Sequence, residues 1–117
     1  MLTRVDHIDI RVSDLEGTVS LLTKMGLEIR RRTSAPRSSV EMALPGEAQV
    51  VFELRPVAEG EHSGVHHIAF RQSDEQDVEH LKEQGVSFLT EHYLIKATGR
   101  TVSSFQDQSG LTWQLTD

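Results

Sequence analysis

The chain contains the same pattern twice. Residues Val5–Asp14 (VDHIDIRVSD) return sixty positions later as Val65–Asp74 (VHHIAFRQSD), and Val50–Leu54 (VVFEL) is matched by Leu111–Leu115 (LTWQL). Each half therefore opens on a segment with a histidine and closes on a segment with an acidic residue or its amide. Two copies of one unit that pack together would bring these polar residues into one place.

Both halves predict the same order of elements, strand–helix–strand–strand–strand. Each β-rich opening run ends at a Ser-Asp pair that is typical of a helix N-cap, and apolar residues then recur at helical spacing as far as Gly26 or Gly85. Helices are expected between these points. Strands are expected at about residues 5–12, 27–33, 39–44, 49–55, 65–71, 86–89, 100–105 and 111–115.

The length of 117 residues suits one domain with a core and is too short for two ordinary ones. We therefore predict a single domain over residues 1–117, with a first module at about 1–58 and a second at about 64–117. One helix covers only one face of each small sheet, so the two sheets are expected to associate through their other faces. The predicted class is α+β, in which two tandem βαβββ modules pair into one cupped sheet structure around a cavity.

Side chains alternate across a strand, and this assigns the polar residues of the repeat to one face. Apolar residues such as Ile8, Ile10 and Ile68 suit the face that packs on a helix. The opposite face then points toward the cavity. It is expected to carry His7, Asp9 and Arg11 from the first module and His67, Ala69 and Arg71 from the second.

Four residues at equivalent places of the two modules can bind a metal: His7, Glu53, His67 and Gln114. The chain has no cysteine, so a metal would be held by N and O ligands. Two imidazoles, a carboxylate and an amide oxygen suit a divalent first-row ion such as Ni, Co, Zn or Mn. Such an ion polarises a carbonyl or stabilises an enolate. The alternative is a degenerate site without metal, because a lone histidine on a strand is more often a hydrogen-bonded core residue.

The charge and hydropathy of the chain exclude several classes of partner. With 12 Lys+Arg against 18 Asp+Glu and a net charge of -6, the chain is not expected to bind nucleic acid or an anionic membrane. No window approaches the roughly 18 apolar residues that a membrane span needs, and no basic-then-apolar leader is present. We expect a cytoplasmic protein that acts on a small molecule.

On these residues, nearly the whole chain resembles the vicinal oxygen chelate superfamily, which includes glyoxalase I, bleomycin resistance proteins and extradiol dioxygenases. The turn Phe105–Gly110 (FQDQSG) is similar to the common F-x-D-P-x-G turn of that family, and Gly64–Phe70 looks like the second-module strand of glyoxalase I and methylmalonyl-CoA epimerase. Those two enzymes use four metal ligands. The dioxygenases use three ligands with a Glu where this chain has Gln114, which disfavours a dioxygenase.

The resemblance implies a metal-dependent lyase or isomerase that moves a proton next to a metal-polarised carbonyl. It suggests Glu53 as the base, because an amide such as Gln114 does not accept a proton usefully. Substrate contacts are expected from Arg11, Arg71, Asp9 and Trp113, although Trp113 also suits a core position. The resemblance further implies a homodimer, since the sheet edges need a partner. The alternative function is a metal-free drug- or metabolite-binding protein of the same fold.

Overall fold

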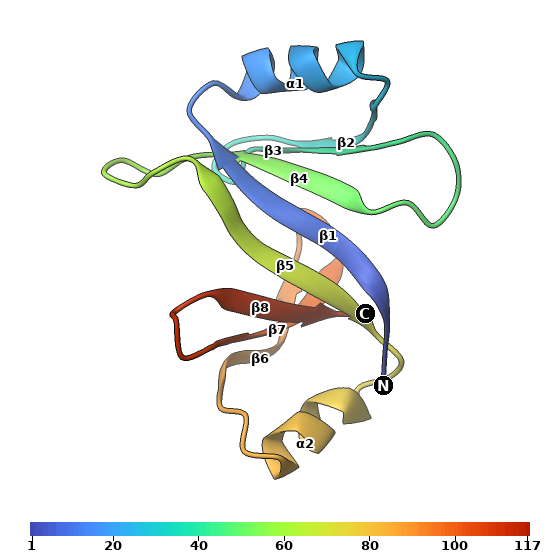
Figure 1. Ribbon diagram of the computed structural model, residues 1–117, viewed down its shortest axis with the longest axis vertical. Coiled ribbons are helices and arrows are strands. Elements are labelled where there is room, and N and C mark those ends of the chain that lie inside the picture. Colours follow the sequence, from blue (N-terminus) through green and yellow to red (C-terminus); the bar gives the residue numbers. More distant parts are fainter. The chain divides into compact units, whose positions relative to one another are not determined.

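The computed structural model describes residues 1–117 and contains ten elements in the predicted order (Figure 1). The α+β class and the repeated βαβββ arrangement are confirmed. The elements are β1 (Leu2–Val12), α1 (Leu15–Lys24), β2 (Glu28–Thr33), β3 (Ser39–Ala43), β4 (Val51–Pro56), β5 (Gly64–Gln72), α2 (Gln76–Glu83), β6 (Phe88–Ile95), β7 (Arg100–Gln106) and β8 (Thr112–Thr116). Neither helix is long and apolar enough to cross a membrane.

The chain divides into two units, which we call the N-terminal unit (His7–His66) and the C-terminal unit (Met1–Asp6 with His67–Asp117). The division falls inside β1 and β5, whereas the sequence pattern placed the module boundary in the segment before Gly64. The expectation that the two modules form one domain stays a prediction. Each unit is described separately below.

In the N-terminal unit the strands lie in the order β2-β3-β4-β1. β3 is antiparallel to both of its neighbours, and β1 is parallel to β4. Helix α1 lies along one face of this sheet (Figure 1). The Asp14 side chain caps α1 by accepting a 2.9 Å hydrogen bond from the Gly17 amide, as the Ser-Asp signal predicted.

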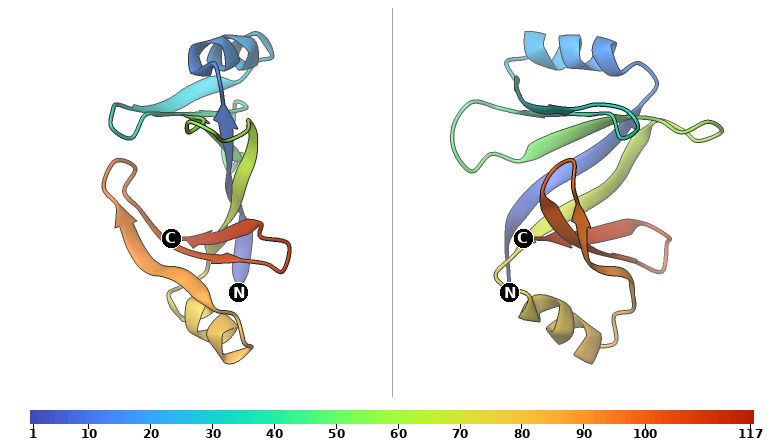
Figure 2. Two further views of the ribbon diagram at one scale, coloured as in Figure 1. Left: turned by 90° about the vertical axis from the view of Figure 1, so that its left-hand side faces the viewer. Right: turned by 180° about the vertical axis from the view of Figure 1, so that it is seen from behind.

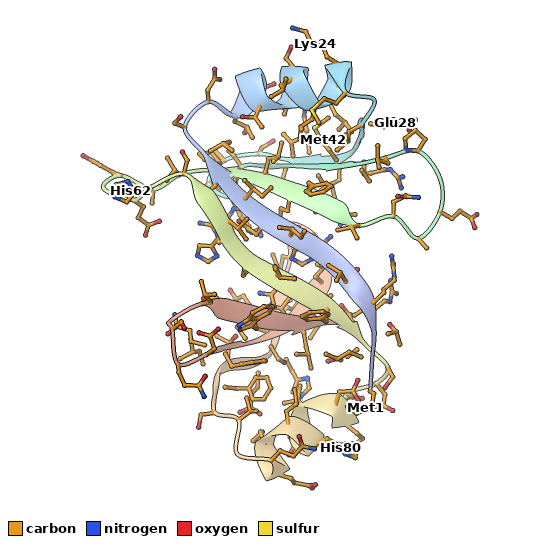
Figure 3. All side chains as sticks on the ribbon, in the orientation of Figure 1. Met1, Lys24, Glu28, Met42, His62 and His80 are labelled. Carbon is orange, nitrogen blue, oxygen red and sulfur yellow. The ribbon has the colours of Figure 1, made fainter.

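The core of the N-terminal unit lies between α1 and the sheet. It consists of Val19, Leu27, Val40, Met42 and Leu54. Figure 3 shows Met42 on the side of the sheet that faces α1. Ile10 and Phe52 also pack against this cluster, so the alternation predicted for β1 and β4 is confirmed. The residues between them, His7, Asp9 and Glu53, therefore point to the other face.

The C-terminal unit repeats this arrangement with strand order β5-β8-β7-β6. β5 is parallel to β8, and the other two pairings are antiparallel. After β5 the chain forms α2 and returns as β6 (Figure 2). Strand β6 runs to Ile95, well past the predicted end at residue 89, and its pairing with β7 contains two register shifts.

Helix α2 begins later than the Ser-Asp signal predicted. Asp74 accepts a 2.8 Å hydrogen bond from the Gln76 amide, but the N-cap position is Glu75, which makes no side-chain capping bond. Asp77 instead reaches back to accept a 2.8 Å bond from the Ser73 amide. The start of α2 is therefore fixed by a carboxylate inside its first turn, where it also opposes the positive end of the helix dipole.

Candidate active site

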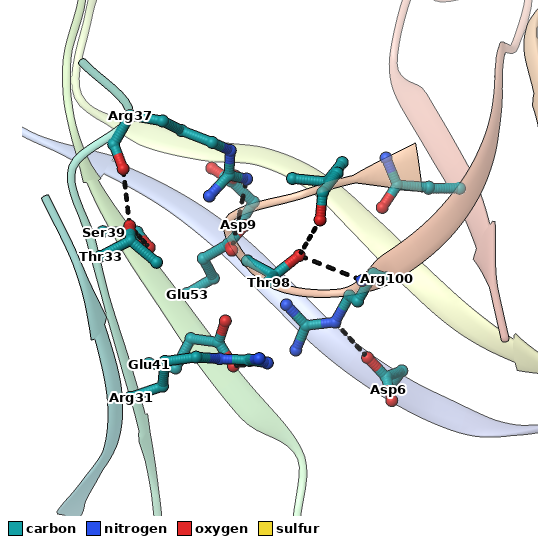
Figure 4. A network of polar contacts seen from close by, with 12 residues as sticks. Asp6, Asp9, Arg31, Thr33, Arg37, Ser39, Glu41, Glu53, Thr98 and Arg100 are labelled. Atoms are coloured by element: carbon teal, nitrogen blue, oxygen red, sulfur yellow. Dashed lines mark hydrogen bonds and ion pairs between the residues drawn. The ribbon is translucent and has the colours of Figure 1, made fainter. Parts of the chain in front are cut away.

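Three carboxylates lie side by side on the face of the N-terminal sheet opposite α1. Strand register pairs Asp9 with Glu53 and Glu53 with Glu41, so the row crosses β1, β4 and β3 (Figure 4). All three are buried, at 0%, 1% and 2% exposed for Asp9, Glu53 and Glu41. Buried carboxylates need compensation by ion pairs or hydrogen bonds, and a cluster of them is a feature of functional sites.

Arginines supply that compensation. Each carboxylate has its own partner: Arg11 Nε lies 2.7 Å from Asp9, Arg31 Nη2 lies 3.2 Å from Glu41, and Arg37 Nη2 lies 3.5 Å from Glu53. The short contact to Asp9 is a charge-assisted hydrogen bond, whereas the contact to Glu53 is long for one. Glu53 is therefore the carboxylate whose arginine partner is held most loosely.

The loop between β2 and β3 places Arg37 above Glu53. The Thr33 hydroxyl donates to the Arg37 carbonyl at 2.6 Å, and the Thr33 and Ser39 hydroxyls lie 2.6 Å apart (Figure 4). Ser39 itself is 1% exposed. Because both ends of the loop are bonded to each other in this way, the Arg37 backbone is fixed and its side chain is directed across the face.

The pKa of Glu53 is raised. Burial is the main cause, and the neighbouring Asp9 charge adds to it, while Arg37 and His7 act in the opposite direction. A carboxyl group whose pKa is raised from its ordinary value toward neutrality is suited to accept a proton from carbon and give it back. The sequence assignment of Glu53 as the base stays a prediction, and burial of its carboxyl group is compatible with that role.

The structure brings together half of the predicted metal ligands in the N-terminal unit. His7 is 1% exposed, and its donor nitrogen lies within 4.8 Å of a Glu53 carboxylate oxygen. Both side chains come from adjacent parallel strands, with Glu53 one pleat further along the same face. One imidazole nitrogen and one carboxylate oxygen at this separation can contact the same divalent ion.

The C-terminal unit holds the other two predicted ligands on matching strands. His67 on β5 is 8% exposed and Gln114 on β8 is 7% exposed. Gln114 Nε2 donates to Ser104 Oγ at 3.1 Å, while its Oε1 is buried and makes no hydrogen bond. An unbonded buried carbonyl oxygen costs about 1–3 kcal/mol of stability. The Oε1 atom of Gln114 is therefore an acceptor that is available to a ligand. Taken separately, each unit offers an imidazole nitrogen and a side-chain oxygen, which are donor types that divalent metal ions accept.

The two units differ in charge at equivalent positions. The row Asp9–Glu53–Glu41 of the N-terminal unit corresponds by register to the row Ala69–Gln114–Ser104 of the C-terminal unit. The N-terminal row therefore has three carboxyl groups where the C-terminal row has none. The C-terminal unit offers neutral donors and acceptors at the corresponding places.

The four residues predicted to contact substrate do not all lie on the polar face. Asp9 and Arg11 lie on the polar face and bond to each other, whereas the Arg71 side chain is exposed. Trp113 lies on the face of β8 opposite Gln114, where its ring stacks on Phe70 with centroids 6.1 Å apart. Its indole also donates a 3.0 Å hydrogen bond to Asp107. The structure thus shows Trp113 in the packing role that the sequence also allowed.

Three charged residues of the polar face were not among the predicted site residues. Glu41 is one of them, although its alternation with Val40 and Met42 carries the signal for this face. Arg37 belongs to a basic stretch of the sequence that gives no local sign of a buried site, yet it is partly buried and pairs with Glu53. Arg55 received no role, and nothing in its local sequence distinguishes it.

Comparisons with known proteins agree with this description. The sequence model of the Glyoxalase/Bleomycin resistance protein/Dioxygenase superfamily matches residues 4–115. No curated protein matches the chain. Among solved structures, methylmalonyl-CoA epimerase of Streptomyces coelicolor in complex with 2-nitronate-propionyl-CoA is similar at 24% identity and a TM-score of 0.83, covering 99% of this chain and 97% of the other.

Two further structures show the same fold. Methylmalonyl-CoA epimerase of Mycobacterium tuberculosis has 21% identity and a TM-score of 0.80, and the match covers 98% of this chain and 87% of the other. A hypothetical protein of Bacillus halodurans C-125 has 19% identity and a TM-score of 0.78, with 97% and 92% covered.

Proposed function

We propose, since this chain belongs to the glyoxalase/bleomycin resistance protein/dioxygenase superfamily, that it is a metal-dependent isomerase or lyase that transfers a proton at a carbon next to a carbonyl group. The observation that carries the proposal is Glu53, a buried carboxyl group with a raised pKa beside His7 and in register with Glu41. General acid–base chemistry on a C–H bond requires such a group.

Four residues are proposed to hold the metal: His7, Glu53, His67 and Gln114. The support is the chemistry of these donors, the short separation of His7 and Glu53, and the unbonded acceptor of Gln114. A bound divalent ion would polarise the substrate carbonyl and thereby acidify the neighbouring C–H bond.

The protein's own residues then provide the proton transfer. Glu53 accepts the proton in its ionised form, because burial raises its pKa and makes the carboxylate a stronger base than an exposed one. Glu41 lies one strand away and is the second carboxylate that an isomerisation needs in order to return a proton at a different position. Arg37 and Arg31 hold these two carboxylates in place, and Arg37 stabilises the Glu53 charge before the transfer.

The first test is metal content. We expect near-stoichiometric uptake of Ni, Co, Mn or Zn by the purified protein, loss of uptake in His7→Ala and Glu53→Gln, and unchanged uptake in the control His80→Ala, since His80 is an exposed residue of α2. Absence of metal under every loading condition would remove the metal-dependent mechanism. Ligand binding without metal would then support the alternative of a drug- or metabolite-binding protein.

The second test is proton exchange. The protein is incubated in D2O with 2-oxoaldehyde hemithioacetals or acyl-CoA thioesters. NMR should then detect deuterium at the carbon next to the carbonyl group. Acyl-CoA compounds should be tested first, because a similar structure contains 2-nitronate-propionyl-CoA. Glu53→Gln should abolish the exchange, whereas Glu16→Gln, which alters an exposed carboxylate, should not. Exchange at the wild-type rate in Glu53→Gln would reject Glu53 as the base.

We also propose that the active form is a homodimer. The support is the strand order of each unit, which leaves β2 and β6 as edges with one neighbour only. Exposed edges commonly find a partner in symmetric assemblies. Light scattering at micromolar concentration measures the mass directly, and a monomer mass would contradict the proposal.

A further inference from the structure

The buried face of the N-terminal unit holds more arginines than carboxylates. Each of the three carboxylates in the row already has one arginine partner. A fourth arginine, Arg55, lies on β4 two residues after Glu53 and therefore on the same face, and register places it beside Arg11. Positive charge on this face thus exceeds negative charge by one, even with every carboxyl group ionised.

Arg55 has a buried hydrogen-bond donor that is not used. Its Nε atom is buried and makes no hydrogen bond, although the charges of Asp9 and Glu53 attract the guanidinium group. Arg37 and Arg11, by contrast, lie near enough to repel the charge of Arg55. Three guanidinium groups therefore lie close together with only two carboxylates among them, Asp9 and Glu53, and a further negative group bound there would offset their repulsion.

Arg37 also has a buried hydrogen-bond donor that is not used. Its Nη2 group faces Glu53 at 3.5 Å, while its Nη1 group is buried and makes no hydrogen bond. Unused buried N–H groups on Arg37 and Arg55 are costly, since each loses its hydration and gains no acceptor. The loop bonds between Thr33 and Ser39 hold Arg37 in this position despite the cost.

We infer that Arg37 and Arg55 form a subsite that binds an oxyanion group of a small molecule, either a carboxylate or a phosphate. Guanidinium groups present N–H donors in a planar fork that matches both groups, and an oxyanion held between the two forks supplies the acceptors that these donors lack. The Arg37 side chain is 23% exposed, so the subsite connects to solvent. Insofar as the oxyanion belongs to the molecule on which Glu53 acts, the inference rests on the proposed function.

Anion binding to metal-free protein tests this inference without turnover. The melting temperature is measured against sodium malonate and against inorganic phosphate, with ionic strength held constant by NaCl so that general screening does not change. The variants are Arg55→Met and Arg37→Met, with Arg55→Lys to keep the charge without the fork. The matched control is Arg32→Met, which removes an arginine whose partner is the exposed Glu16.

We expect malonate, phosphate or both to stabilise the wild type in a saturable manner. The anion's dissociation constant should rise at least about tenfold in Arg55→Met and less in Arg55→Lys, and stay unchanged in Arg32→Met. A response to malonate alone identifies a carboxylate subsite, and a response to phosphate alone identifies a phosphate subsite. No saturable response in the wild type, or equal affinity in wild type and Arg55→Met, overturns the inference. Metal uptake and proton exchange are measured separately, so failure here leaves the proposed function standing.

Discussion

Replacement of Arg55 by methionine should stabilise the ligand-free protein. The change removes the buried Nε–H group that has no acceptor, a group of the kind that costs about 1–3 kcal/mol. It also removes the repulsion that Arg37 and Arg11 exert on the third positive charge. Methionine keeps most of the apolar stem of arginine, so little packing is lost.

The expected gain is near the low end of that range, because the Arg55 side chain is only partly buried. We expect the free energy of unfolding to rise by about 1 kcal/mol, which corresponds to roughly 4 °C in melting temperature for a chain of this size. Chemical denaturation by urea at pH 7 in a buffer without carboxylate or phosphate measures this directly. Arg32→Met is again the control, and it should change stability by less than about 0.5 kcal/mol, as exposed ion pairs usually do.

A loss of stability in Arg55→Met would refute the reasoning, since it would mean that attraction to Asp9 and Glu53 outweighs the missing hydrogen bond and the repulsion. The predicted combination is greater stability with weaker anion binding. That combination is the signature of a residue that is retained for binding and held at a cost to folding.

Two further predictions concern local structure. A Cβ atom added at Gly17 would lie 2.3 Å from Asp14 Oδ2. Replacing a helical glycine by alanine usually raises the free energy of unfolding by about 1 kcal/mol, but Gly17→Ala should give no such gain in the wild type and the full gain in an Asp14→Ala background. A double-mutant cycle in urea measures this difference. The pKa of Asp107 is lowered chiefly by the hydrogen bond from the Trp113 indole. The ionised Asp107 therefore stabilises the folded protein above the ordinary aspartate pKa of about 4, and this stabilisation is lost as pH falls through the lowered pKa. The urea midpoint should therefore fall less between pH 5 and pH 2 in Asp107→Asn than in the wild type, and equal falls would reject this role.

The repeat made most of the fold predictable. Alternation in two copies assigned His7 and His67 to corresponding positions, and the helix stops at Gly26 and Gly85 followed from apolar spacing. The far half of β6 was not predictable, because Thr90, Glu91 and His92 show no apolar alternation. This edge strand pairs only with β7 and needs no apolar face, so the pairing itself and not the side chains extends the strand.

The arginines of the site were harder to predict from the sequence than the proposed metal ligands. Arg37 belongs to a run of basic residues, and the direction of its side chain depends on the hydroxyl contact between Thr33 and Ser39, which brings two strands together. The proposed role of Arg55 can be inferred only from strand register, which places Arg55 beside Arg11. Local patterns give the face of a residue, whereas the charge balance of that face depends on pairing across strands.

Gln114→Glu tests the different charges of the two units. In the metal-free protein the new carboxylate would be buried, and it would keep only the one neutral donor that Ser104 provides in place of the present bond from Gln114 Nε2. We expect the free energy of unfolding to fall by about 1–3 kcal/mol without metal. With a divalent ion bound at the proposed ligands, a carboxylate should bind more tightly than an amide, and the same variant should show a lower dissociation constant for the metal.

The two measurements have opposite signs, which separates metal ligation from simple packing. Stability is measured by urea denaturation after metal removal, and affinity by competition with a chromophoric chelator. Gln114→Leu is the matched control, because it keeps the apolar stem and loses the acceptor. It should weaken metal binding while leaving metal-free stability closer to that of the wild type. Weaker metal binding in Gln114→Glu, with metal-free stability unchanged, would mean that Gln114 Oε1 is not a ligand and that its missing hydrogen bond has another origin.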